Sequence, residues 1–384
     1  MITDLHKSFL QLVRLGIGHS ESTVITDNVD WVALKALADG QGLSAVVLDG
    51  IDKLNSNSTN STNGLPLDLK LEWIGEVLQG EQTYKLHQEV ATDMANLFHS
   101  NAIRTYVLKG RIVSECYPKP NHRVSVDLDC FLLPDKGDFD AWTLGNDLIR
   151  AKHFEVGDDF YKNSAFKLPG MTVENHQFLT PFRGNERLEK LERFFQEQFK
   201  EFNGSQDSQT RMSDQRSSVN VQELENSRIE GTWLYRPPVM VSALFLIEHA
   251  YSHFLHEGLT WRMVLDWVLF KKKHENEIDW ALFEAYVDEF GFRKFYESYN
   301  RLGKLLVGEL TADGLQLTDK KMLDDIWVPL DLHESLHGVK AKFQLAGNYW
   351  RARWKYKYFT DMTWIRALYE WVSGAAFDRH PTLE

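Results

Sequence analysis

Two aspartates stand two residues apart in a short apolar run, and their spacing suits the binding of divalent cations. The run from Val124 to Leu133 reads VSVDLDCFLL, and its alternation predicts a strand with Asp127 and Asp129 on one face and Val124, Val126, Leu128 and Cys130 on the other. Paired carboxylates in water-poor surroundings repel each other, so cations usually stabilise them. Mg²⁺ prefers one or two protein carboxylates with phosphate oxygens and water, as in phosphoryl transfer. The alternative is a strand face that is simply solvated.

Two flanking segments favour the cation interpretation. A predicted strand over 103–108 ends in Lys109-Gly110, where glycine allows a phosphate to approach the backbone and a following helix N-terminus favours anions. A later predicted strand carries Glu174 in the run TVENH, from which its carboxylate can reach the same place. We therefore predict Asp127, Asp129 and Glu174 as the catalytic and metal-binding carboxylates.

The elements that must position these residues follow from hydrophobic periodicity. The predicted helices cover about 3–16, two segments within 30–50, 67–100, 111–117, 138–152 and 186–202, and the chain reads as helical again from 236 onward. The predicted strands cover 103–108, 124–133, 153–157, 163–168 and 171–179. Leu168-Pro169-Gly170-Met171 predicts a turn that joins the last two strands as a hairpin.

This order predicts an α+β protein with a mixed core between helical regions. The expected divisions are an N-terminal helical region (1–100), an α/β core (101–202), a flexible linker (203–235) and a C-terminal helical domain (236–384). The linker prediction rests on the polar run NGSQDSQTRMSDQRSS, which has almost no large apolar side chains.

Composition excludes several classes of protein. The net charge of −12 and the pI of about 5.6 give a field that repels nucleic acid and anionic membranes, so a polyanion would need a local basic patch. Two cysteines, Cys116 and Cys130, make a disulfide framework improbable and favour a reducing cytoplasm. We expect no signal peptide, because the start MITDLHKSFLQLVRLGIG lacks a basic region followed by an uninterrupted apolar run. We also expect no transmembrane helix and no membrane partner, because no run of about 18 apolar residues occurs.

Several short runs, over roughly 103–270, together form a pattern. They are Tyr106-Val107-Leu108-Lys109-Gly110, Tyr117-Pro118, Arg123, Asp127-Leu128-Asp129, Glu174-Asn175-His176, the segment 248–254, Gly258, Arg262 and Asp266-Trp267. The combination resembles a known family, the uncharacterised nucleotidyltransferases of the DNA polymerase beta-like superfamily. The 248–254 segment is most similar to versions common in gut bacteria.

The resemblance implies a small mixed sheet with flanking helices and transfer of a nucleoside monophosphate from an NTP such as ATP, with Mg²⁺, or Mn²⁺ in its place, and release of pyrophosphate. Asp127 and Asp129 would be the metal-binding pair, and Glu174 the third carboxylate and general base. The nucleotide-binding residues would be Lys109, Gly110, Arg111, Arg123, His176, His253 and Arg262. Arg111 stands where the superfamily has a small hydroxyl residue, and it either replaces that phosphate contact or points away.

Other readings stay open. His249 and His253 have the i, i+4 spacing of a zinc pair, but they also suit a place near the nucleotide or in the core. Arg262 either reaches a phosphate or pairs with Asp266 one turn on. The segment 340–358 interleaves basic and aromatic residues and suits RNA, or is an amphipathic helix. The acceptor could be tRNA, a protein or a sugar, and the alternative function is an inactive nucleotide-binding or scaffold protein.

Overall fold

The computed structural model describes residues 2–21, 25, 29–57, 65–204, 223–327, 350–361 and 363–366. Its centre is a six-stranded mixed sheet with the order β3-β4-β5-β2-β1-β6. The strands are β1 (Ile103–Val107), β2 (Asp127–Pro134), β3 (Val156–Phe160), β4 (Asn163–Leu168), β5 (Met171–His176) and β6 (Leu234–Tyr235). The β2–β5 and β1–β6 pairs are parallel and the other pairs antiparallel. The predicted α+β class, mixed sheet and β4–β5 hairpin are confirmed.

Helices cover both faces of the sheet. On one face lie α4 (Leu67–His99) and α6 (Ala141–Ala151), where Gly145 leaves room for Leu132 of β2. On the other face lie α7 (Glu186–Gly204) and α9 (Val239–His256), where the ring of Phe199 packs 4.7 Å from that of Phe131. Because both faces are covered, residues 128–132 of β2 are all buried. Buried and exposed side chains therefore do not alternate along this strand as they do in a sheet with one face open to solvent.

The predicted start of the second strand is wrong. β2 begins at Asp127, and Val124 and Val126, predicted to share a strand face with Leu128 and Cys130, are 45% and 72% exposed. The reason lies just upstream, where Arg123 is drawn away from the sheet to pair with Asp266 of α10 (Trp261–Lys273). An ion pair between segments distant in sequence therefore overrides the local apolar pattern.

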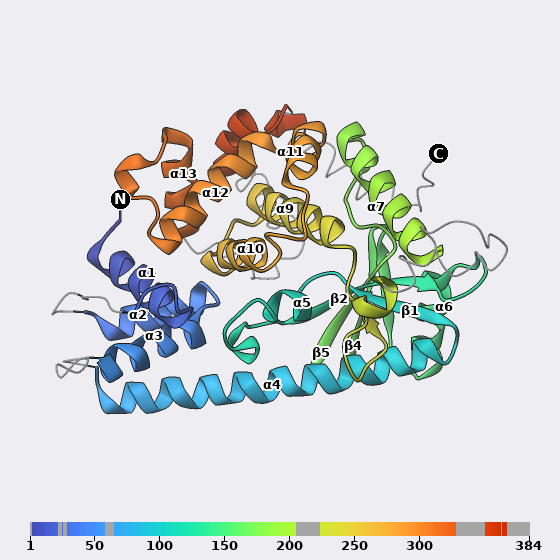
Figure 1. Ribbon diagram of the computed structural model, residues 1–384, viewed down its shortest axis with the longest axis horizontal. Helices are drawn as coiled ribbons and strands as arrows, with labels where there is room; N and C mark the ends of the chain where they lie inside the picture. Colours follow the sequence, from blue (N-terminus) through green and yellow to red (C-terminus); the bar gives the residue numbers. More distant parts are fainter. Residues whose placement is uncertain are drawn as a thin grey trace.

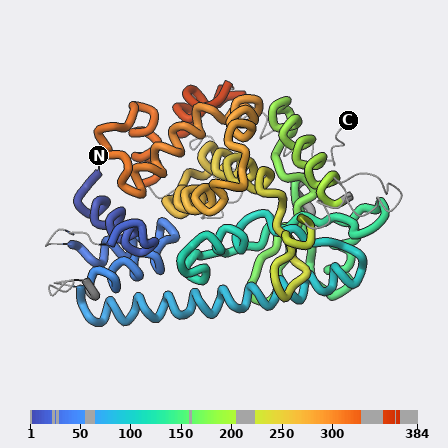
Figure 2. Tube along the Cα trace, in the orientation of Figure 1, coloured from blue at the N-terminus to red at the C-terminus, as the bar shows by residue number. Residues whose placement is uncertain are grey.

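The helices at the two ends of the described chain form one body. The N-terminal helices α1 (Asp4–Gly16), α2 (Trp31–Gly40) and α3 (Ser44–Asn57) lie beside α10, α12 (Arg293–Val307) and α13 (Leu317–Trp327), as Figure 2 shows by colour. The helix α11 (Trp280–Glu289) packs against α9 and α12. Arg14 of α1 donates hydrogen bonds of 2.7 Å to the carbonyls of Leu305 and Leu306. The ring of His6 stacks on Trp327 at 3.9 Å. Regions predicted as separate along the sequence thus share a packed interface.

The long helix α4 connects this helical body to the sheet (Figure 1). Near its start, the indole of Trp73 donates to the carbonyl of Ser44 in α3 at 3.1 Å. Near its end, it packs against β1 and β6. Two short elements, α5 (Arg111–Ser114) and the 3-10 turn η1 (Pro120–His122), fill the connection between β1 and β2, and a second 3-10 turn, η3 (Ala312–Gly314), precedes α13.

The predicted linker has a structured end. Residues 205–222 lie outside the described residues, while 223–227 are helical and β6 joins the sheet edge, which the sequence analysis did not predict. Of the basic-aromatic segment, 340–349 lies outside the described residues and 350–359 is helical. Among the residues that the structure covers, none of the helices combines the length and apolar character that a membrane crossing requires.

Candidate active site

The parallel pairing of β2 with β5 brings the predicted carboxylates together. In this register Asp129 lies opposite Glu174, and Asp127 lies opposite Thr172. Side chains two residues apart on a strand share a face, so Asp127 and Asp129 project from β2 on the same side, and Glu174 and His176 do so from β5. That side of the sheet is covered by α7 and α9, since the ring of His176 packs edge-on against Phe245 of α9.

Three of these side chains form a compact group of potential metal ligands. One ligand atom each from Asp129, Glu174 and His176 lies within 4.8 Å of the other two, and no comparable group of three was found elsewhere among the described residues. His176 Nε2 is 3.1 Å from Asp129 Oδ1 and 3.6 Å from Glu174 Oε2. Asp129 is buried, yet its Oδ2 has no hydrogen-bond partner with acceptable geometry among the residues described. This oxygen instead forms an ion pair with Lys109, so the buried carboxylate is positioned to accept positive charge.

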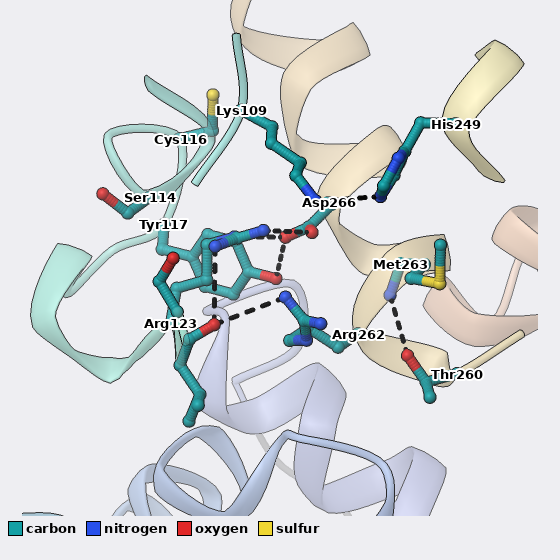
Figure 3. Close-up of polar contacts among 12 residues, drawn as sticks. Lys109, Ser114, Cys116, Tyr117, Arg123, His249, Thr260, Arg262, Met263 and Asp266 are labelled. Atoms are coloured by element: carbon teal, nitrogen blue, oxygen red, sulfur yellow. Dashed lines mark hydrogen bonds and ion pairs between the residues drawn. The ribbon is translucent and has the colours of Figure 1, made fainter. Parts of the chain in front are cut away.

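Lys109 supplies a positive charge to this group. Its Nζ lies 3.2 Å from Asp129 Oδ2 and 3.5 Å from Asp127 Oδ2, as ion pairs. The same ammonium contacts Nε2 of His249, on α9, at 3.3 Å (Figure 3). Asp127 remains about one-third exposed, whereas Asp129 is covered. The lysine predicted to bind phosphate therefore lies where the carboxylates converge.

The electrostatics of the group are those of an ionised cluster. Burial opposes the charge on Asp129, but Lys109 and the hydrogen bond from His176 outweigh it and hold the pKa of Asp129 well below its ordinary value. The hydrogen bond from His176 likewise lowers the pKa of Glu174. Burial alone would lower the pKa of His176, yet its two carboxylate partners raise it. The pKa of Lys109 is also raised, because three carboxylates outweigh its burial. Both carboxylates are thus ionised at neutral pH.

The helix α9 brings His249 to the site, a residue for which the sequence had left open a place near the nucleotide or in the core. Burial and the neighbouring charge of Lys109 lower the pKa of His249 well below 6.5, so its ring is neutral and accepts a hydrogen bond from the ammonium. The charge of Lys162, between β3 and β4, also acts on His176 and His249. The i, i+4 histidines had marked this part of α9, but Lys162 carries no signal in the sequence. His253 instead contacts Glu257 at 2.7 Å.

Arg123 and Asp266 form a buried pair beside the site (Figure 3). The guanidinium of Arg123 donates to both oxygens of Asp266, at 2.8 and 2.7 Å, and the Tyr117 hydroxyl donates to the same carboxylate at 2.7 Å. The intrahelical pair between Arg262 and Asp266 is not formed, and Arg262 donates to the carbonyl of Val124 at 3.3 Å instead. This bidentate pair fixes the entry to β2 against α10.

Gly110 and Arg111 follow β1 where the chain turns into α5. Gly110 has a φ of 63°, and a Cβ there would lie 3.0 Å from Ser125 Oγ, so both conformation and space favour glycine. Burial lowers the pKa of Arg111, and the charged groups that act on it are Glu115 and Arg236. Its Nη1 lacks a hydrogen-bond partner among the described residues. Arg111 is therefore oriented toward a different set of charges from those around Lys109.

The chain was compared with family models, curated proteins and solved structures. The search found no match among curated proteins and none among solved structures. A family model described as an uncharacterised nucleotidyltransferase matches residues 27–308, a stretch that contains the whole sheet, the carboxylates, Lys109 and the histidines of α9. Since this match covers well over half of the sequence, the chain belongs to that family of nucleotidyltransferases.

Proposed function

We propose that the protein transfers a nucleoside monophosphate from an NTP to an acceptor hydroxyl, with a divalent metal ion, and releases pyrophosphate. The observation that carries the proposal is the convergence of Asp127, Asp129 and Glu174 from two adjacent parallel strands onto one place, with Lys109 beside them. Family membership supports nucleotidyl transfer in general. The geometry supports the assignment of these particular side chains.

The carboxylates have two tasks in this proposal. Asp127, Asp129 and Glu174 hold Mg²⁺ or Mn²⁺, which when bound neutralises the phosphates during the reaction. Glu174 is partly exposed and its pKa is lowered, so it is ionised and within reach of an acceptor. It accepts the proton of the acceptor hydroxyl as that oxygen bonds to the α-phosphorus, while the bond from phosphorus to the bridging oxygen breaks and pyrophosphate leaves.

Basic side chains position the triphosphate. Lys109 offers its ammonium to the phosphates, and neutral His249 keeps that ammonium within the site. Gly110 allows a phosphate to approach the backbone. The predicted contacts from Arg111, His253 and Arg262 remain proposals. Arg123 is already bound to Asp266, which favours a role in positioning β2 over direct phosphate contact.

The acceptor is proposed as a tRNA, protein or sugar hydroxyl. In the described part of the basic-aromatic segment, Lys355 is buried and donates to the carbonyl of Phe254 at 2.7 Å, and Tyr356 is buried too. These two residues serve packing, so the segment supports RNA binding less strongly than its composition suggested. The second candidate function is an inactive nucleotide-binding or scaffold protein, and the ion pairs of Lys109 favour it, because they neutralise the carboxylates without a metal.

The test is turnover of each of the four NTPs with Mg²⁺ or Mn²⁺, followed by pyrophosphate release and by labelling of the protein itself. The wild type is compared with the Asp127→Asn/Asp129→Asn double variant. Metal-dependent release that the double variant loses supports the transferase. Metal-dependent NTP binding without turnover, also in a cell extract that supplies acceptors, supports the scaffold. Failure of folded wild-type protein to bind any NTP with either metal rejects both functions.

A further inference from the structure

His176 divides its two ring nitrogens between the backbone and the carboxylates. Nδ1 lies 3.2 Å from the carbonyl oxygen of Phe178, and a carbonyl can only accept, so Nδ1 carries a proton. Nε2 is directed at Asp129 and Glu174, where without a metal it donates to the carboxylates, and a bound cation would take the place of that proton. Histidines that bind metals almost always donate their other ring N–H to a carbonyl or carboxylate, which fixes the tautomer and the direction of the ring.

The spacing around Nε2 suits a shared ion. Nε2 lies 3.1 Å from Asp129 Oδ1 and 3.6 Å from Glu174 Oε2. Neighbouring ligand atoms of a six-coordinate ion lie roughly 3 Å apart, since bonds of about 2.1 Å meet at right angles. The other oxygen of Asp129, Oδ2, is buried and lies 3.2 Å from the ammonium of Lys109, so the fold already places positive charge at this carboxylate. The imidazole is thus aimed at the carboxylates rather than at a phosphate site beyond them.

We infer that Nε2 of His176 is itself a ligand of the metal ion in the proposed nucleotidyltransferase site, and that the site selects Mn²⁺ over Mg²⁺. The inference rests on the proposed function for the presence of an ion and goes beyond it in assigning a nitrogen ligand. Mg²⁺ binds oxygen donors and retains its waters, whereas imidazole favours first-row transition ions. The proposed carboxylates together with one imidazole are therefore a donor set of mixed type, in contrast to an all-carboxylate magnesium site.

The test uses the full chain with Mn²⁺ as the probe, with and without a non-hydrolysable ATP analogue. Pulsed electron paramagnetic resonance detects a ¹⁴N nucleus bonded to Mn²⁺. We expect nitrogen coupling in the wild type, its loss in His176→Gln, and a Mn²⁺ affinity about tenfold or more weaker in that variant. The matched control is His122→Gln, which removes a buried histidine that also lies between two carboxylates. This control retains the nitrogen coupling. Competition with Mg²⁺ gives the selectivity, which we expect to fall in His176→Gln.

The outcomes separate this inference from the proposed function. Mn²⁺ that binds the wild type through Asp127 and Asp129 without nitrogen coupling overturns the inference and leaves the proposed function intact. Unchanged selectivity in His176→Gln does the same. Absence of Mn²⁺ binding in the wild type, even with the nucleotide analogue, overturns both. The wild-type spectrum alone decides the nitrogen ligand, so the test does not depend on the folding of a variant.

Discussion

A histidine lies between two carboxylates at two places in this protein, and the two places differ in how the ring is used. In the first, His122 of η1 contacts Asp49 of α3 through Nδ1 at 2.7 Å and Glu81 of α4 through Nε2 at 2.8 Å. In the second, His176 directs Nε2 alone at both carboxylates, and a backbone carbonyl occupies Nδ1. We call these the His122 bridge and the His176 cluster.

Both places combine a histidine with two carboxylates, so the residue types alone do not distinguish a structural bridge from a candidate ligand site. In the His122 bridge the ring stands between Asp49 and Glu81, so the carboxylates face opposite edges of the imidazole and join three elements. In the His176 cluster the carboxylates converge on one nitrogen, and their ligand atoms lie within 4.8 Å of each other. Both places carry a lysine as well, Lys119 in the bridge and Lys109 in the cluster.

The largest effect is expected from removing one aspartate charge in the cluster. Asp129→Asn should reduce metal-dependent pyrophosphate release about a thousandfold, because it removes a buried negative charge that is held in place at the proposed metal site. Asp49→Asn in the bridge should leave turnover within about twofold and instead lower the free energy of unfolding by about 2 kcal/mol, through weakened charged hydrogen bonds. Turnover and urea unfolding of both variants check this pair. Equal losses of turnover in Asp129→Asn and Asp49→Asn would contradict the different roles assigned to the cluster and the bridge.

The lysines should differ in the same way, with a smaller effect. Lys109→Met should weaken NTP binding about a hundredfold, because it removes a covered ammonium beside the proposed phosphate site. Lys119→Met removes a 57% exposed ammonium, whose pairing with Asp49 is screened by water, and should leave NTP binding unchanged. Calorimetric titration with a non-hydrolysable analogue measures both affinities. A Lys109→Met variant that binds like the wild type places the triphosphate elsewhere.

The smallest effect is the pH dependence of the stability that the bridge contributes. Burial lowers the pKa of His122, but its bonds to Asp49 and Glu81 outweigh this and raise it above 6.5. A raised folded pKa gives stability that is complete below about pH 6.5 and is lost as pH rises through the folded pKa. His122→Gln should therefore cost about 1.5 kcal/mol at pH 6 and much less at pH 9. Urea unfolding at both values checks it, and a cost that grows with pH contradicts the assigned charge.

Most helices and strands could be predicted from the sequence because hydrophobic periodicity is a local pattern. The three carboxylates could be predicted because they belong to runs that resemble the family. Period-two alternation marked β2, and the long helical pattern marked α4 nearly to its ends. Asp127, Asp129 and Glu174 were named from spacing and resemblance, but their convergence depends on the parallel register of β2 with β5, which no local pattern encodes.

The features that the sequence did not predict depend on contacts between residues far apart in the chain. Lys109 and His249 are 140 residues apart, and Arg123 reaches Asp266 across 143 residues. The second contact explains why Val124 and Val126, apolar and alternating, leave the sheet. The strand β6 has only two residues, too few for a periodic signal, and is formed by pairing with β1.

The helix α4 has a consequence for how this chain can change length. It has 33 residues, a span of about 50 Å, and it is anchored near one end by Trp73 to α3 and near the other by packing on β1. Adding one residue between these anchors would turn one end by about 100° relative to the other and lengthen the helix by about 1.5 Å. An insertion or deletion between the anchors should therefore disturb the packing at one end unless it adds or removes whole helical turns. The length of α4 thus limits the insertions and deletions that the protein can accept in evolution.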